Sequence, residues 1–366
     1  MHKNILLHLT LISGIGPATI KMIVASIGPS NLQTLYVCKV EDLVRLGLSY
    51  DRAVKIVQGL QDHSLLDAEL ALIEKYQIGW TTFLCPDYAS LLLQIEQPPI
   101  VIYYQGANLL AFNQAIAFVG SRKADAYARV VVEKLVPSLV AQNWTIVSGG
   151  ALGVDSLVHD QVVQSGGKTI VVLGSGLLHW YPLQNHGLFS RVIAAGGMII
   201  SCFSLKTQPI ASNFPARNRI ISGLSLGTVV VQAARKSGAL ITADFALEQG
   251  RQVFAVPGSI EHGLHDGCHD LIQQGAKLVQ SVDDIINEFG IFTKMNHDLE
   301  QQQRIVSEKK YDSDEIAILE QLLVATSIED LLQNVQIPLE DLVSKLFALS
   351  LDGKVSQDIM GLWKRI

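Results

Sequence analysis

Two glycine-rich segments near the middle of the chain carry residue types that suit a phosphate ligand. Each follows a short apolar run and precedes a stretch of helical periodicity. Glycine lets backbone N–H groups crowd onto an anion at the start of a helix, and an arginine fork matches phosphate geometry. The residues that we predict to contact phosphate here are Gly120, Ser121, Arg122, Ser148, Gly149, Gly150 and Gly153.

Three later segments repeat this pattern of small or cationic residues after an apolar run. They are a glycine pair, a cluster of arginines and asparagines around a phenylalanine, and a helix start with hydroxyls and glycine. The phenylalanine offers a stacking face for a base. Tyr181 and Asn185 either line the same edge or belong to a packed turn. The further predicted contacts are Gly174, Gly176, Asn213, Phe214, Arg217, Asn218, Ser237, Gly238 and Thr242.

Signatures of catalysis and of cofactor binding are weak. Asp155 and His159 lie four apart and would share a helix face, but no nucleophile accompanies them. The sequence has no Walker loop and no completed Gly-x-Gly-x-x-Gly. Residues 262–270 hold six possible metal ligands, but their glycines predict a loop. We therefore predict no catalytic residue, no cofactor and no metal.

These segments require a sheet whose strands end at one edge. From 115 to about 290, continuous apolar runs alternate with helical patterns, which is typical of a parallel sheet wrapped by crossover helices. The fold class is therefore α/β, with an extended Rossmann-like parallel-sheet core. Its strands are predicted at 115–119, 144–148, 169–173, 197–202, 227–232, 252–256 and 277–280.

Smaller segments flank the core, which we place at 81–292 with short strands in its first thirty residues. Residues 1–80 are predicted to be a small helical domain, similar to SAM or helix-hairpin-helix domains. Its Gly14-Ile15-Gly16-Pro17 turn either presents amides to a DNA phosphate or is a tight turn inside a bundle. Residues 293–311 are predicted to be a polar linker, and residues 312–366 a winged-helix-like domain that ends in a β-hairpin.

Composition and charge limit the classes of function. The four cysteines are scattered, and no apolar run reaches the roughly 18 residues of a membrane span, so we expect a cytoplasmic protein without membrane contact. No secretory signal is apparent. The net charge is −6, and residues 312–366 alone carry ten acidic and four basic side chains. Because negative side chains repel the phosphates of DNA, we expect this acidic segment to be dispensable for DNA binding.

Taken together, the central motifs resemble the DprA/Smf family of bacterial DNA-processing proteins. The matching stretches begin with Val119-Gly-Ser-Arg122 and Ser148-Gly-Gly-Ala-Leu-Gly-Val-Asp155. They continue with Phe214-Pro-Ala-Arg-Asn-Arg219, Ser237-Gly-Ala-Leu-Ile-Thr242 and Val256-Pro-Gly258. The resemblance covers about 180 residues in the right order.

The resemblance implies a non-catalytic protein that binds and protects incoming single-stranded DNA, forms a homodimer and helps load RecA during natural transformation. It implies that Arg122, the Ser148 to Gly153 loop and Arg217 face DNA phosphates. The chain departs from the family pattern at Ala128, Cys202, Gln232 and His269, and His186 is the only candidate for the basic residue that is common between Pro182 and Leu188.

Two rival functions remain for comparison. A Rossmann-like nucleotide phosphoribohydrolase needs a Pro-Gly-Gly-x-Gly-Thr loop and a following glutamate, and Gly227-Thr228 lacks that context. An NAD(P)-binding sensor needs an acidic ribose ligand, which is missing. The sequence therefore favours a single-stranded DNA-binding recombination mediator.

Overall fold

The structure is a computed structural model that describes residues 2–108, 112, 114–290, 312–322, 326–335, 337–351, 354–357 and 362–365. The chain divides into two compact units, Met1–Ile286 and Asn287–Ile366, which are described one at a time. The predicted linker at 293–311 lies outside the described residues.

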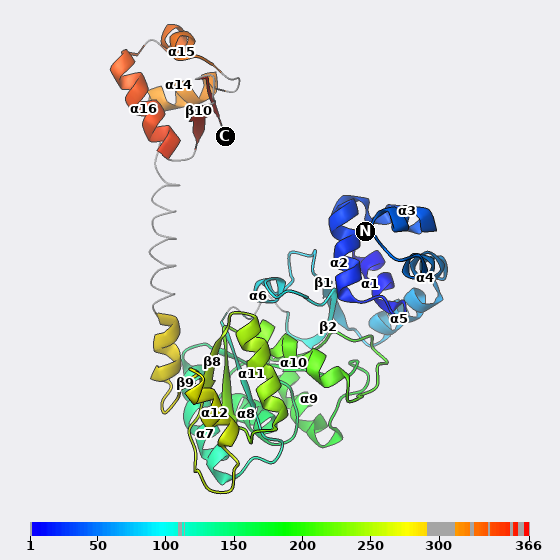
Figure 1. The fold of residues 1–366 in the computed structure, drawn as a ribbon. Helices are drawn as coiled ribbons and strands as arrows, with labels where there is room; N and C mark the ends of the chain where they lie inside the picture. The colour runs from blue at the N-terminus through cyan, green and yellow to red at the C-terminus, as the bar shows by residue number, and fades with distance from the viewer. Residues whose placement is uncertain are drawn as a thin grey trace. The chain divides into compact units, whose positions relative to one another are not determined.

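The first unit is built on a sheet whose described strands follow the order β1-β2-β6-β5-β4-β3-β7-β8-β9 (Figure 1). From β6 to β9 all neighbouring strands are parallel, whereas β1 and β2 add an antiparallel edge. All seven predicted strands are confirmed. The strands are β1 Gly79–Thr82, β2 Val101–Gly106, β3 Ala115–Gly120, β4 Thr145–Ser148, β5 Thr169–Val172, β6 Met198–Ser201, β7 Gly227–Gln232, β8 Gln252–Ala255 and β9 Lys277–Leu278.

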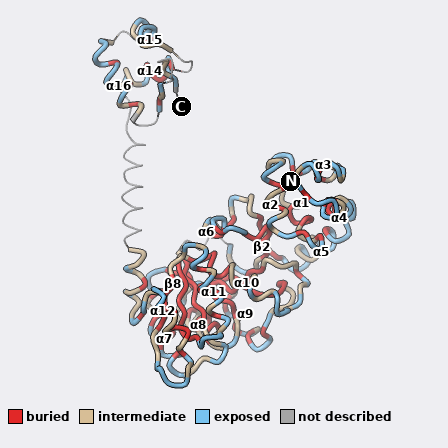
Figure 2. The backbone as a smooth tube through the Cα atoms, viewed as in Figure 1, coloured by how far each residue is buried: buried red, intermediate tan, exposed pale blue. Residues whose placement is uncertain are grey.

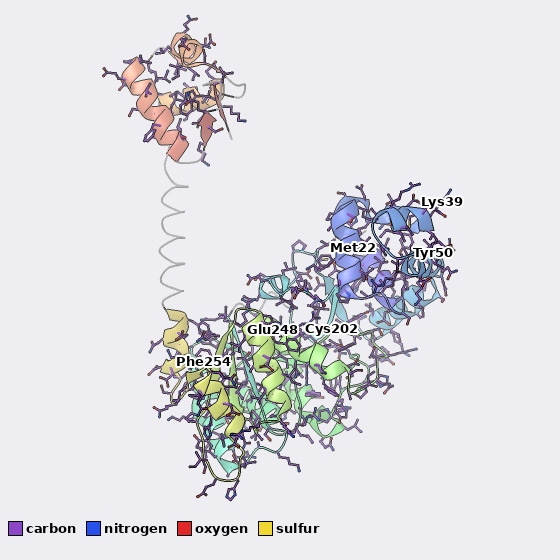
Figure 3. The ribbon with its side chains drawn as sticks, in the orientation of Figure 1. Met22, Lys39, Tyr50, Cys202, Glu248 and Phe254 are labelled. Carbon is purple, nitrogen blue, oxygen red and sulfur yellow. The ribbon has the colours of Figure 1, made fainter. Side chains whose placement is uncertain are left out.

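Helices cover both faces of this sheet, which explains its continuous apolar strands (Figure 2). Buried residues of α10, α11 and α12 form one apolar cluster with the strands, while α7, α8 and α9 pack against one another. Phe254 of β8 is fully buried in the sheet (Figure 3). The helices are α7 Ala126–Ala141, α8 Val154–Gln164, α9 His186–Ala194, α10 Asn213–Gly223, α11 Gly238–Glu248 and α12 Asp266–Gln273.

The N-terminal segment is helical as predicted, and it belongs to the first unit. Pro17 opens its second helix directly after Gly16, where proline is well tolerated because the first N–H has no helical partner. One apolar cluster joins these helices to Val171 of β5 and Phe189 of α9. The elements are α1 His2–Leu11, α2 Pro17–Ile27, η1 Pro29–Tyr36, α3 Val40–Arg45, α4 Tyr50–Gln61 and α5 Ser64–Lys75.

The second unit has an apolar core of its own. Its helices are α14 Ser313–Gln321, α15 Ile328–Val335 and α16 Leu339–Leu351. The predicted terminal hairpin is confirmed, because β10 Val355–Gln357 pairs antiparallel with β11 Trp363–Arg365. A bridge from Thr326 to Trp363 adds a third extended segment to the hairpin. None of the helices in the described ranges is long and apolar enough to cross a bilayer.

Candidate phosphate-binding pocket

The strand order creates a topological switch point at β3. The chain runs outward from β3 through β4, β5 and β6, and then returns to place β7 on the other side of β3. The loops after β3 and β7 therefore diverge, and this divergence opens a crevice at the carboxyl edge of the sheet. The register shifts between Val119 and Gly120, where β3 pairs with Gln232 of β7. Such a bulge re-aims the end of the strand.

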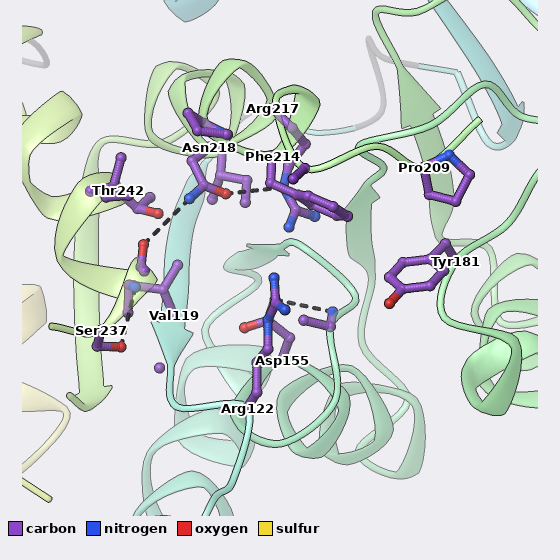
Figure 4. A pocket seen from close by; sticks show the side chains of 18 residues that line it. Val119, Arg122, Asp155, Tyr181, Pro209, Phe214, Arg217, Asn218, Ser237 and Thr242 are labelled. Atoms are coloured by element: carbon purple, nitrogen blue, oxygen red, sulfur yellow. Dashed lines mark hydrogen bonds between the residues drawn. The ribbon is translucent and has the colours of Figure 1, made fainter. Parts of the chain in front are cut away.

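A cavity of about 680 Å³ occupies this crevice (Figure 4). A smaller hollow of about 80 Å³ adjoins it through shared lining residues, among them Arg122, Phe214 and Arg217. Of the residues predicted from sequence, those that line one or both spaces are Gly120, Arg122, Gly149, Gly174, Phe214, Arg217, Asn218, Ser237, Gly238 and Thr242. Ser121, Ser148, Gly150, Gly153, Gly176 and Asn213 lie outside both linings.

Arg122 is the cation at the mouth of the pocket. Its side chain is exposed, and no ion pair joins it to a carboxylate within the described residues. The guanidinium carbon lies 5.5 Å from the centroid of the Phe214 ring, so the two groups form a cation–π pair. A phosphate that enters the crevice meets an arginine fork next to an aromatic face.

Arg217 lines the same two spaces, but its side chain is buried. Only 5% of the residue is exposed. Its guanidinium donates to the carbonyls of Gly149 and, at 2.6 Å, Val172, while Nε donates to Asn218 Oδ1 at 3.0 Å. Burial lowers the pKa of Arg217 to about 10, so it remains charged at neutral pH. The side chain therefore braces the ends of β4 and β5 and adds positive potential from below the pocket.

The loop between β4 and α8 fits around this arginine because its glycines lack side chains. A Cβ on Gly149 would lie 2.4 Å from Arg217 Nη1. Gly153 has φ +82°, and a Cβ there would lie 2.2 Å from the carbonyl oxygen of Ser121. The Val154 amide donates to that same carbonyl at 3.0 Å, which ties the β3 loop to the start of α8. Both predicted loops are thus held together by backbone contacts.

Ser148 and Asn185 hydrogen-bond to backbone carbonyls at or near this loop, and Thr242 of α11 is buried. Ser148 is buried and its hydroxyl donates to the Phe118 carbonyl at 2.7 Å. Thr242 is also buried, although it belongs to the pocket lining. Asn185 donates through Nδ2 to the Gly150 carbonyl at 2.8 Å and to Ser156 Oγ at 3.0 Å. Of the two predicted roles of Asn185, lining and packing, the hydrogen bond to the loop backbone fits packing.

Asp155 and His159 are both buried on α8. Asp155 accepts a hydrogen bond from the Ala151 amide at 3.2 Å, and burial raises its pKa against the opposing effect of Arg217. Burial lowers the pKa of His159 to about 3, and its Nδ1 lies 2.8 Å from Thr169 Oγ1. His159 is therefore a neutral core histidine at physiological pH.

Tyr181 lines both spaces of the pocket, which its sequence context leaves open between lining and packing. It is 44% exposed and its ring centroid lies 5.9 Å from that of Phe214. The two rings and Arg122 provide stacking and cationic surfaces side by side (Figure 4). The available signal was the position of Tyr181 shortly after the Gly174-Ser175-Gly176 loop.

The four residues that depart from the family pattern, Ala128, Cys202, Gln232 and His269, are not among the lining residues of either space. Gln232 is buried and its Oε1 accepts from the Asp125 amide at 3.4 Å. Burial raises the pKa of Cys202, which follows β6, to about 11 (Figure 3). His269 Nε2 lies 3.1 Å from the Gly258 carbonyl. Ala128 is buried in α7, and its amide donates to Asp125 at the N-cap.

The predicted loop at 262–270 is wrong in its second half, because α12 begins at Asp266. The Gly267 amide donates to the Ala233 carbonyl at 2.8 Å, which ties the start of α12 to the end of β7. In the described ranges, no group of three or more His, Cys, Asp or Glu side chains is arranged to hold a metal ion.

Comparisons with known proteins identify similar molecules. The family model for DNA recombination-mediator protein A matches residues 80–290, and a SAM-like helix-hairpin-helix tandem matches residues 6–62. DNA processing protein DprA of Streptococcus pneumoniae is 45% identical over 199 residues, which are 54% of this chain and 70% of that protein. DprA of Bacillus subtilis is 41% identical over 229 residues, 62% of this chain and 77% of that protein.

Two solved structures share the fold. The X-ray structure of DprA from Streptococcus pneumoniae matches with a TM-score of 0.68 at 34% identity and covers 78% of this chain and 97% of that chain. DprA from Helicobacter pylori matches with a TM-score of 0.52 at 28% identity and covers 57% of this chain and 95% of that chain. The second structure is described as showing the single-stranded DNA binding mode of that protein.

Proposed function

Because the chain belongs to the DNA recombination-mediator protein A family, we propose that its switch-point pocket binds the backbone and bases of single-stranded DNA. The observation that carries the proposal is the exposed Arg122 beside Phe214 at the mouth of the crevice. The fork pairs with a phosphate, and the ring offers a face to a neighbouring base. A duplex hides its base faces in the stack, so single strands are preferred.

We also propose the partners and the place of action that the family resemblance implies. The protein forms a homodimer, acts in the cytoplasm and helps load RecA onto the strand that it protects. These proposals rest on the family match and on no contact of the described residues. Analytical ultracentrifugation, and RecA filament assembly on strands coated with this protein, test them separately from DNA binding.

No enzymatic step is part of the proposal. The phosphoribohydrolase alternative is not favoured, because Gly227 and Thr228 begin the buried strand β7 and do not form a substrate loop. His159 shares helix α8 with Asp155 and is a residue type that can act as a general base. It is buried and neutral, so it is not placed to exchange a proton with a substrate.

Fluorescence anisotropy with a labelled single-stranded oligonucleotide and the matching duplex tests the proposal. We expect tighter binding of the single strand and a steep fall in affinity as the salt concentration rises. Equal affinity for the two forms would contradict the proposed role of the aromatic face. Release of free base from a nucleoside monophosphate by the pure protein would support the phosphoribohydrolase instead.

A further inference from the structure

Helix α16 carries apolar side chains on two adjoining strips of its surface. One strip, formed by Leu342, Leu346 and Leu349, is fully buried in the core of the second unit. The other, formed by Leu339, Val343 and Phe347, is 52%, 47% and 63% exposed. We call this second set the α16 stripe. Its members are spaced by four residues, so they lie in one line along the helix over about 12 Å.

Acidic side chains predominate in the unit that carries the α16 stripe. Glu340 and Asp341 are exposed on the same helix, and Glu329 and Asp330 are exposed in the first turn of α15. Lys345 is the basic residue of α16, and it pairs with Asp312 and, at 3.4 Å, with Asp314. Its charge is therefore neutralised within the unit, and the field around the stripe is negative.

This surface chemistry does not fit nucleic acid. A DNA-reading helix presents lysine, arginine or amide side chains to phosphates and base edges. Here the exposed positions of α16 carry carboxylates, apolar groups and the Ser344 hydroxyl, and a polyanion would be repelled. Pairing of two copies of the stripe would bring together two segments that each carry a net charge of −6, which like-charge repulsion disfavours.

From this combination we propose that the α16 stripe is the docking surface for an amphipathic helix of another protein, with Lys or Arg beside its apolar face. An exposed line of apolar anchors at helical spacing is the feature that helix-in-groove recognition uses. Charge complementarity with the surrounding carboxylates then sets the chemistry of the partner. This surface is independent of the switch-point pocket, so it does not rest on the proposed single-stranded DNA binding.

The experiment uses the full chain and a labelled 18-residue helical peptide with one leucine face and lysine elsewhere. A second peptide keeps the leucine face and replaces lysine by glutamate. We expect the lysine peptide to bind at least tenfold more tightly than the glutamate peptide at about 0.1 M salt. The double variant Val343→Ser/Phe347→Ser should weaken lysine-peptide binding at least tenfold, because it removes two apolar anchors.

Matched variants separate the stripe from general charge and from misfolding. Val37→Ser removes an apolar side chain that is 82% exposed in the first unit, and binding should stay within twofold. Glu340→Gln/Asp341→Asn should weaken lysine-peptide binding severalfold with the stripe intact. Leu339→Ser tests the stripe at its other end, and circular dichroism confirms that each variant is folded.

Three results would overturn the proposal. One is wild-type peptide affinity in the folded Val343→Ser/Phe347→Ser and Leu339→Ser variants. The second is a loss of self-association in these variants, which would assign the stripe to a second copy of this chain. The third is a loss of duplex or single-stranded DNA affinity, which would assign α16 to nucleic acid.

Discussion

The mouth of the switch-point pocket and the layer beneath it use the same residue type for different purposes. At the mouth, Arg122 is exposed and contacts the face of Phe214. Beneath, Arg217 contacts the same ring at 5.7 Å, but its guanidinium donates to carbonyls at the ends of β4 and β5. One arginine is available to a ligand, and the other holds the loop that shapes the site. Proximity to the pocket therefore does not by itself identify a ligand contact.

Arg217→Ala is expected to have the largest effect, and the effect is on stability. Removal of the guanidinium leaves the Gly149 and Val172 carbonyls without this donor and takes a favourable positive charge away from the buried Asp155. Loss of one partner from such a buried charged network costs about 3–5 kcal/mol of unfolding free energy. Urea denaturation followed by circular dichroism measures this loss.

Arg219→Ala on the same helix is the matched control for Arg217→Ala. Arg219 is half-buried and bonds weakly to Gln97 at 3.4 Å, so the change should cost less than about 1 kcal/mol. Equal stability of the two variants would show that the Arg217 contacts do not support the fold.

Arg122→Ala should leave stability unchanged and weaken binding of single-stranded DNA. Loss of one charge-assisted contact costs about 1.5–3 kcal/mol, or roughly one to two decades in affinity. The slope of affinity against salt should shrink by about one contact. Lys123→Ala provides the control, since Lys123 is an exposed neighbour outside the pocket lining. If both variants lose affinity equally, only general charge matters at this edge.

The burial of His159 should make the unfolding free energy depend on pH. Because burial lowers the pKa of His159 to about 3, the unfolded chain binds more protons than the folded chain between about pH 3 and pH 6.5. Stability is therefore lost as the pH falls through that window, by about 2 kcal/mol from this residue between pH 7 and pH 5.

His159→Gln should remove that component of the acid sensitivity. The comparison of the variant with the wild type cancels the opposite contribution of Asp155, whose raised pKa favours the folded state at low pH. Denaturation curves at pH 7 and pH 5 measure the difference. Parallel loss of stability in both proteins would mean that His159 is protonated in the folded state.

The smallest effect is expected from deletion of the second unit. A chain that ends at Gly290 should bind single-stranded DNA within a few-fold of the full chain, because residues 312–366 carry a net charge of −6. The deletion keeps the whole pocket, which lies in the first unit. A hundredfold loss at matched salt, with the shortened chain folded, would place part of the DNA site in the second unit.

The positions of the strands and loops along the chain can largely be predicted from the sequence. Apolar runs that end in glycine identify β3, β4 and β5, because parallel strands covered by helices must be apolar on both faces. The same patterns identify the glycine and arginine segments that meet at the carboxyl edge. The terminal hairpin also follows from local pattern.

Only the tertiary structure decides which polar side chains face the pocket. Arg217 reaches the Gly149 and Val172 carbonyls across 68 and 45 residues of chain, so nothing near residue 217 in the sequence reveals its burial. Arg122 and Arg217 both belong to motifs of small and cationic residues, but Arg122 lies in the loop directly after β3, whereas Arg217 packs over the ends of β4 and β5. Burial depends on which segments the fold brings together, and local residue patterns do not contain that information.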